Sequence, residues 1–115
     1  MGCKCMLHHL PSRMQQHLLD KFLISTDLEV TAIMHAMAAG ELNEVRLMAH
    51  TLKSPARMMG AMLLGNLCEE IEMAVRMNDA QSCSIHVNEL KAVFYRTQTA
   101  IRKHVESFSA HEVTA

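Results

Sequence analysis

Apolar residues recur along this chain at the three- and four-residue intervals of amphipathic helices. The first such stripe follows Pro11, which suits the first turn of a helix, and predicts a short helix that ends near Ser25. Thr26-Asp-Leu-Glu29 then has the pattern of a capping box, in which a threonine and a glutamate satisfy free backbone donors at a helix start. We therefore predict a second helix from Thr26, with Gly40 as the breaker at its C-terminal end.

Three further segments complete the predicted fold. One helix is expected over 41–60, and another from about residue 63 to 77. Asn78-Asp79 has the residues of a turn, since Asn tolerates a left-handed backbone and Asp can cap the helix that follows. A last helix is expected from there to about residue 108. Four long helices with short connections predict an all-α, up-down-up-down antiparallel four-helix bundle, with the additional short N-terminal helix packed across one end.

The composition agrees with a single helical domain. The chain has 115 residues, of which 50% are hydrophobic and 20% charged, with only 4 Gly and 2 Pro. We expect a flexible tail over 1–10, the bundle over 11–108 and a frayed end over 109–115. Cys68 and Cys83 lie in helical patterns, where free cysteine behaves as a small hydrophobic residue. The net charge of -1 argues against a broad nucleic-acid-binding surface, and no apolar run is long enough for membrane insertion, so we expect a cytoplasmic protein.

The most informative segment is 41–60, whose apolar positions leave one polar face. At about 100° per residue, its apolar stripe centres roughly 140° away from His50. The stripe consists of Leu42, Val45, Ala49, Leu52, Ala56 and Met59. The residues predicted within about 60° of His50 are Asn43, Arg46, Leu47, Lys53, Ser54 and Arg57. His50 is therefore predicted to be exposed at mid-helix, among three cations and small polar groups.

These residue types suit a phosphoryl acceptor. A neutral imidazole nitrogen is nucleophilic near neutral pH, because the ordinary pKa of imidazole is about 6.5. Lys53 and Arg57, one and two turns further along the same face, can pair with phosphoryl oxygens. Leu47 and the small Ser54 offer a partly apolar spot where another protein can dock. Phosphoryl transfer needs alignment and charge neutralisation more than covalent machinery, so a partner can supply the metal and the aspartate.

Ala49-His-Thr-Leu-Lys53, with Gly60 ten positions after the histidine, resembles the signature of histidine-containing phosphotransfer (HPt) domains. The resemblance continues through Leu67-Cys-Glu-Glu-Ile-Glu72 and Arg76-Met-Asn-Asp79, and it covers roughly residues 20–107. It implies a helical bundle that shuttles phosphoryl groups between receiver-domain aspartates in multistep two-component phosphorelays. Such a module is either free-standing or the C-terminal part of a hybrid sensor kinase.

By that resemblance, His50 is the phosphorylation site, Lys53 the cation that stabilises the phosphoryl group, and Gly60 a close-packing position between helices. It implies receiver domains as partners, Mg²⁺ on the receiver, no cofactor on this chain, and a phosphocarrier rather than an enzyme. A monomer is expected, because a small carrier needs its histidine face free. Two positions depart from the family pattern. Ser54 replaces a glycine, and Pro55 replaces a serine and predicts a kink one turn beyond His50.

Two other functional classes compete with the carrier. A helical interaction module would dock receiver domains without carrying phosphate, and it would tolerate His50→Gln. A metalloenzyme built in a four-helix bundle would need inward-facing Glu-x-x-His pairs, which the sequence lacks. The sequence also lacks the glycine loops of ATP-binding motifs, so the chain is not expected to use ATP itself.

The N-terminal tail holds four potential soft metal ligands, Cys3, Cys5, His8 and His9. These residue types can bind Zn²⁺ or Cu⁺. Their spacing matches no common zinc motif, and the segment is terminal. We therefore assign no metal site from the sequence.

Overall fold

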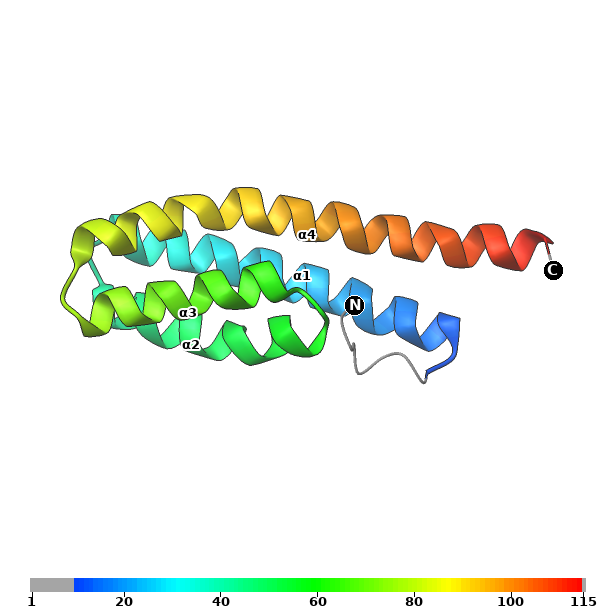
Figure 1. The fold of residues 1–115 in the computed structure, drawn as a ribbon, viewed down its shortest axis with the longest axis horizontal. Coiled ribbons are helices and arrows are strands. Elements are labelled where there is room, and N and C mark those ends of the chain that lie inside the picture. The colour runs from blue at the N-terminus through cyan, green and yellow to red at the C-terminus, as the bar shows by residue number, and fades with distance from the viewer. Residues whose placement is uncertain (1–9, 115) are drawn as a thin grey trace.

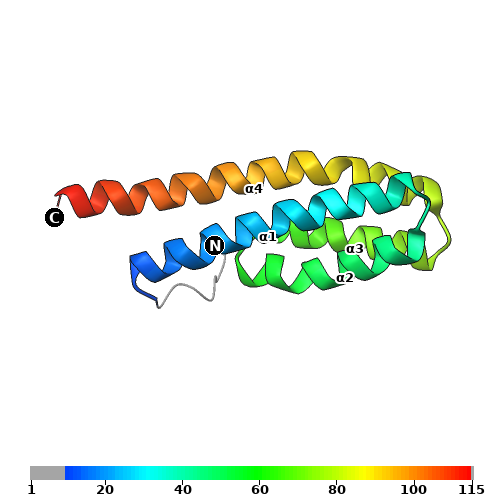
Figure 2. The ribbon, with the colours of Figure 1, turned by 180° about the vertical axis from the view of Figure 1, so that it is seen from behind.

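The computed structural model describes residues 10–114, with side chains described over 10–107. Four helices account for this part of the chain, and it contains no strand: α1 (Ser12–Ala38), α2 (Leu42–Met58), α3 (Met62–Arg76) and α4 (Ala80–Thr114). Successive helices run in alternating directions along the long axis (Figure 1). The shorter α2 and α3 form a hairpin against α1 and α4, whose outer ends extend past it (Figures 1 and 2).

The first helix is longer than the sequence pattern predicts. Both the predicted end near Ser25 and the helix start at Thr26 are wrong, because α1 continues through them from Ser12 to Ala38. Thr26 is buried and continues the apolar stripe of α1, so its backbone has no reason to leave the helix. Ser25 Oγ instead donates to Glu29 Oε1 at 3.1 Å, one turn along the same helix. The 12–25 segment is therefore the first half of α1, not an additional short helix.

The three joints between helices share one backbone arrangement. Each has a residue of positive φ just after the helix: Gly40 (75°), Gly60 (83°) and Asn78 (56°). In each joint the N–H of the next residue donates back across the turn: Glu41 to the Ala36 carbonyl at 2.9 Å, Ala61 to the Ala56 carbonyl at 2.8 Å, and Asp79 to the Ala74 carbonyl at 2.9 Å. The predicted breaker at Gly40 and the turn at Asn78 are confirmed. Gly60 has a conformational reason to be glycine, because left-handed φ is strained for most residues.

Asp79 begins the last helix as predicted. Its Oδ1 accepts a hydrogen bond from the Ser82 backbone N–H at 3.0 Å, and its Oδ2 accepts one from Ser82 Oγ at 2.7 Å. These contacts satisfy a backbone donor that a helix start leaves without a partner. The backbone hydrogen bond first, and then the hydroxyl, lower the pKa of the Asp79 carboxyl. The helix extends to Thr114, beyond the boundary expected at residue 108.

The helix α2 presents the face that its pattern predicts. Val45, Ala49, Leu52 and Ala56 are completely buried, while Leu42 and Met59 are half-buried. The core continues through fully buried residues of the other helices, namely Ile33, Leu64, Ile71 and Leu90. Burying each such side chain stabilises the fold by about 1.5–3 kcal/mol relative to exposure. This packing fixes the rotation of α2 and thus turns its opposite face outward.

Pro55 does not interrupt this helix. The helical backbone runs through it to Met58, and the Pro55 carbonyl accepts the Met59 N–H at 3.0 Å. Pro55 itself is exposed and lies in the last turn of α2. There its ring displaces no packed side chain. Over the part of the chain described here, no helix combines the length and apolar character that crossing a membrane requires.

Candidate functional site

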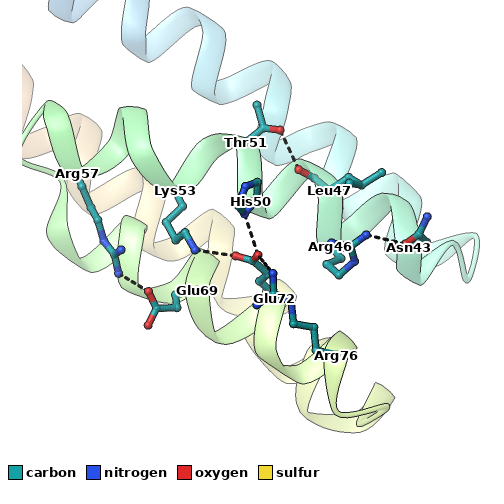
Figure 3. A network of polar contacts seen from close by, with 10 residues as sticks. All are labelled: Asn43, Arg46, Leu47, His50, Thr51, Lys53, Arg57, Glu69, Glu72 and Arg76. Atoms are coloured by element: carbon teal, nitrogen blue, oxygen red, sulfur yellow. Dashed lines mark hydrogen bonds and ion pairs between the residues drawn. The ribbon is translucent and has the colours of Figure 1, made fainter.

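His50 lies midway along α2 on the face opposite the core. Its side chain is 58% exposed, which confirms the exposure predicted from periodicity. The ring nevertheless has a firm contact on one edge, where Nδ1 lies 2.8 Å from Oε2 of Glu72 on α3 (Figure 3). One imidazole nitrogen is thus held by the protein, while most of the ring remains open to solvent.

Glu72 is the buried centre of the site. Its side chain is only 2% exposed, and its two carboxylate oxygens accept from three donors. Lys53 Nζ on α2 lies 2.8 Å from Oε1, and Arg76 on the next turn of α3 lies 2.7 Å from Oε2. Figure 3 shows the side chains of His50, Lys53 and Arg76 converging on this carboxylate. A buried charge is tolerated when it is paired and hydrogen-bonded in this way.

The partners of Glu72 determine its protonation state. Burial alone would raise the pKa of the carboxyl group. The hydrogen bonds from Lys53 and His50 outweigh burial, and the pKa lies below its ordinary value of 4.5. Glu72 is therefore a carboxylate at neutral pH and can only accept hydrogen bonds.

That charge determines the tautomer of His50. Because a carboxylate has no proton to donate, Nδ1 of the neutral imidazole must carry the proton in the 2.8 Å contact. The lone pair then lies on Nε2, the ring nitrogen that does not contact Glu72. Nε2 is therefore the nucleophilic nitrogen, and the contact between Nδ1 and Glu72 on the other side of the ring fixes its orientation.

The predicted cations take different places in the structure. Lys53 is 19% exposed, and its ammonium contacts Glu72, the carboxylate that also contacts His50. Arg57 points to α3, where it donates to Glu69 Oε1 at 2.9 Å and Asn66 Oδ1 at 3.1 Å. Arg46 donates to Asn43 Oδ1 at 3.1 Å within α2 (Figure 3). Of the three, only Lys53 belongs to the cluster around His50.

A family model, that of the Hpt domain, matches residues 17–100. The chain belongs to the Hpt domain family. The match includes all of α2 and α3 and therefore every residue of the cluster around Glu72. Hpt domains are phosphocarrier modules of phosphorelays rather than enzymes, and they interact with receiver domains. The comparisons with curated proteins and with solved structures give no match.

In this Hpt domain, Gly65 explains why Arg57 crosses to α3. A Cβ at position 65 would lie 2.6 Å from Arg57 Cγ and 3.2 Å from its Nε. Because glycine has no side chain, this buried position on α3 leaves room for Arg57 to pass and reach Glu69. Gly60, the position expected to be close-packed between helices, lies in the turn between α2 and α3. Gly65 is a second glycine of this region and is packed beneath a side chain of the neighbouring helix.

In this Hpt domain, apolar side chains are exposed on α2 beside His50 and at the C-terminal end of α3. Leu47 on α2 is exposed one turn before His50, and Ser54 is exposed one turn after it. Met73 on α3 and Met77, which directly follows that helix, are both exposed and line the same shallow hollow as Lys53, Glu72 and Arg76. The lining of this hollow combines two exposed methionines with charged side chains, a combination suited to docking another protein.

Sequence reasoning on α2 alone missed Glu72 and Arg76 as members of the site. A helical wheel shows which residues share a face, but it does not show which residue of another helix lies opposite. A signal was nevertheless present in α3. Glu72 directly follows Ile71 and lies one turn after Cys68, within the apolar stripe of that helix. A carboxylate at a core position requires buried partners, and His50 and Lys53 provide them.

The Hpt domain contains no group of three or more potential metal-ligating side chains within the part of the chain that is described. Cys3, Cys5, His8 and His9, the candidate ligands of the N-terminal tail, lie outside the described residues. Cys68 and Cys83 are buried and free, as their helical positions predict. Burial, with a further contribution from Glu29, raises the pKa of the Cys68 thiol to about 12, so the thiol is protonated at neutral pH.

Proposed function

We propose that this Hpt domain is a phosphohistidine carrier in a multistep two-component phosphorelay. His50 accepts a phosphoryl group from the aspartate of one receiver domain and passes it to the aspartate of another. The observation that carries the proposal is the state of the imidazole. Nδ1 is held at 2.8 Å by a buried carboxylate, while the ring is 58% exposed to an incoming partner.

The proposed transfer conserves charge and needs no cofactor on this chain. The Nε2 lone pair attacks phosphorus in line with the aspartyl oxygen, the N–P bond forms, and the P–O bond to aspartate breaks. The leaving carboxylate takes the bonding electrons, and the imidazole becomes positively charged, because Nδ1 keeps its proton. Glu72 faces that proton and stabilises the new positive charge. Mg²⁺ belongs to the receiver in this scheme.

In this proposal Lys53 acts on the carboxylate of Glu72 rather than on Nε2 of His50. Its ammonium donates to Oε1 and leaves Oε2 directed at the imidazole. Lys53 thus acts as a positioning residue for His50 and adds positive charge close to the arriving phosphoryl group. Leu47 and Ser54, on either side of His50, are proposed to contact the receiver. Arg46 is proposed to contact it at the edge of the same face, whereas Arg57 acts within the fold.

The carrier is proposed to act as a cytoplasmic monomer, either free-standing or as one module of a hybrid sensor kinase. A monomer leaves the exposed face of His50 available to one receiver at a time. Two receivers can then use the same surface in succession, because a single acceptor nitrogen serves both transfers.

The test is label transfer from a receiver domain phosphorylated on its aspartate. The wild-type chain is expected to acquire an acid-labile, base-stable phosphoryl group, which His50→Gln abolishes. His35→Gln is the matched control, since His35 is exposed on α1 and lies outside the cluster. A chain that binds the receivers but takes no label from any of them is a helical interaction module instead. Label that persists in His50→Gln would refute the assignment of the acceptor.

A further inference from the structure

A groove lies between the turn that joins α2 to α3 and the neighbouring part of α4. It has a volume of about 390 Å³ and is lined by residues 59–63 of the turn and by Arg96, Thr97, Ala100 and Ile101 of α4. The hairpin of α2 and α3 ends at this turn, while α4 continues past it (Figure 1). The groove shares no residue with the cluster around His50 and is therefore a separate surface of the domain.

The side of the groove that the turn provides is apolar and exposed. Residues 58–65 include no charged side chain. Within this stretch Met58, Met62 and Leu63 are 47%, 45% and 64% exposed. Large apolar side chains exposed together are typical of a surface that binds another molecule. The two methionines suit such a surface, because their flexible side chains adapt to partners of different shape.

The side of the groove that α4 provides is basic. Over 90–105 this helix has no Asp or Glu but carries Lys91, Arg96, Arg102 and Lys103. Arg96 lines the groove and also lines a shallower hollow beside it, which reaches Lys103 about two turns further along the helix. Within the described residues, none of these four cations forms an ion pair.

The ion pairs of the described residues lie elsewhere in the domain. Their carboxylates occupy positions 69–89 of α3 and α4, before the basic stretch begins. The charge on the α4 side of the groove is therefore not neutralised by the domain itself. A partner that complements this surface has apolar side chains for the turn and negative charges for α4.

We propose that this groove binds an acidic amphipathic helix of a partner protein. Apolar side chains of that helix, spaced at three- and four-residue intervals, fill the groove against Met62 and Leu63. Its carboxylates pair with Arg96 and Lys103. The apolar contacts supply most of the affinity, because exposed ion pairs contribute little each, and the charges select an acidic partner.

The proposed partner leaves His50 accessible. Met59, the residue of the groove nearest to His50 along the chain, follows it by about two and a half helical turns. In addition, α4 packs mainly against α1 and α3, whereas His50 lies on α2. A receiver can therefore reach the histidine while the helix stays bound in the groove. The inference does not depend on the proposed function, since it uses no residue of the phosphoryl-transfer site.

The test uses a synthetic helical peptide with leucine on one face and glutamate on the other as the probe. Binding to the full chain is measured by calorimetry and by NMR of the Met62 and Leu63 methyl groups. We expect these methyl signals to shift and the affinity to fall as salt is added. A peptide with lysine in place of every glutamate should bind at least about tenfold more weakly. Equal binding of the two peptides, or no binding of the acidic one, overturns the proposal.

Substitutions locate the binding surface. Arg96→Glu and Leu63→Ser should each weaken binding of the acidic peptide about tenfold. Both side chains are exposed, so both variants are expected to fold. The matched controls are Lys91→Glu, at an exposed cation of α4 outside the groove, and Leu28→Ser, at a leucine of α1 that is 69% exposed. Both controls should bind the peptide as the wild type does. Controls that weaken binding as much as the groove variants overturn the assignment of the groove.

Other occupants of the groove give different results. A second copy of the chain would produce a dimer in sedimentation that Leu63→Ser dissociates. An anionic membrane would produce binding to phosphatidylserine vesicles that Arg96→Glu abolishes. Either result without binding of the acidic peptide overturns the proposal. His50→Gln should bind the peptide with wild-type affinity, so failure of phosphoryl transfer and failure of this proposal are distinguishable.

Discussion

Lys53 on α2 and Glu72 on α3 form an ion pair of 2.8 Å in which both charges are largely removed from water. Such a pair is stable only as long as both members are present, because a single buried charge is costly. The pair also joins the helix that carries His50 to the helix that orients its ring. Substitutions in the pair therefore affect two properties, the stability of the fold and the reactivity of the imidazole.

Lys53→Ala is expected to lower the free energy of unfolding by about 1–3 kcal/mol, since Glu72 keeps only His50 and Arg76 as partners. The chain should still fold, and phosphoryl transfer through His50 should be slower. Urea unfolding and receiver-dependent label transfer measure the two effects. Lys21→Ala, at an exposed position on α1, controls for the loss of a surface cation. Transfer at the wild-type rate, with an unchanged phosphohistidine lifetime, would remove Lys53 from the mechanism.

Glu72→Gln tests the tautomer of His50. The amide has nearly the shape of the carboxyl group but is neutral, and it can present N–H donors to Nδ1. We expect phosphorylation at Nε2 to slow by at least about tenfold, because the lone pair is no longer fixed there and the imidazolium loses its counter-charge. ³¹P NMR distinguishes the Nε2 from the Nδ1 isomer and should detect a rise in the latter.

The control for that substitution is Glu69→Gln, which removes a carboxylate from the same helix without touching His50. It should leave both the rate and the isomer ratio unchanged. If Glu72→Gln behaves like Glu69→Gln, the contact at Nδ1 has no part in directing the reaction.

The depressed pKa of Glu72 makes stability depend on pH in a defined direction. A carboxylate whose pKa is lower in the folded state contributes stability that is fully present above its unfolded pKa, which is ordinarily 4.5. That contribution is lost as the pH falls through the folded-state value. The free energy of unfolding should therefore fall more steeply below pH 4.5 in the wild type than in Glu72→Gln. Asp79, whose pKa is also lowered, is present in both proteins, so its contribution cancels.

Gly65→Ala is expected to lower stability by about 1–2 kcal/mol, because the new Cβ would lie 2.6 Å from Arg57 Cγ. Thermal unfolding gives the measurement. The combined variant with Arg57→Ala supplies the control, since alanine at 57 has no Cγ to meet the new methyl group. In that background Gly65→Ala should be neutral or stabilising, as alanine is the better helix former by about 1 kcal/mol. If Gly65→Ala lowers stability equally in both backgrounds, the contact with Arg57 is not the cause of the strain.

The sequence predicted the α2 face because that face is determined locally. Ala49 and Leu52 follow helical spacing on the apolar side, and His50 must then point away from them. The N-terminal helix was mispredicted for the converse reason. Thr26 has the residue type of a cap, but tertiary packing buries it as a core residue of a continuous helix. The free energy gained from a local helix cap, about 1 kcal/mol, is smaller than the free energy gained by packing a long apolar stripe.

The site was predictable only in part. His50 and Lys53 belong to one helix, so their shared face follows from their spacing of three residues. Which atom Lys53 touches depends on α3, because Glu72 lies between the two helices. The placement of Arg57 likewise depends on the missing side chain at Gly65. Contacts of this kind follow from the rotation of one helix against another, which the sequence pattern of a single helix does not encode.

The position of Glu72 between α2 and α3 has a thermodynamic consequence. In the proposed function, the carboxylate that holds the two helices together is also the counter-ion of the phosphorylated ring, so folding and phosphorylation are linked equilibria. If the folded hairpin favours the phosphorylated imidazole by some factor, phosphorylation must favour the folded hairpin by the same factor. A receiver that removes the phosphoryl group then breaks the N–P bond and also lowers the stability of the folded Hpt domain.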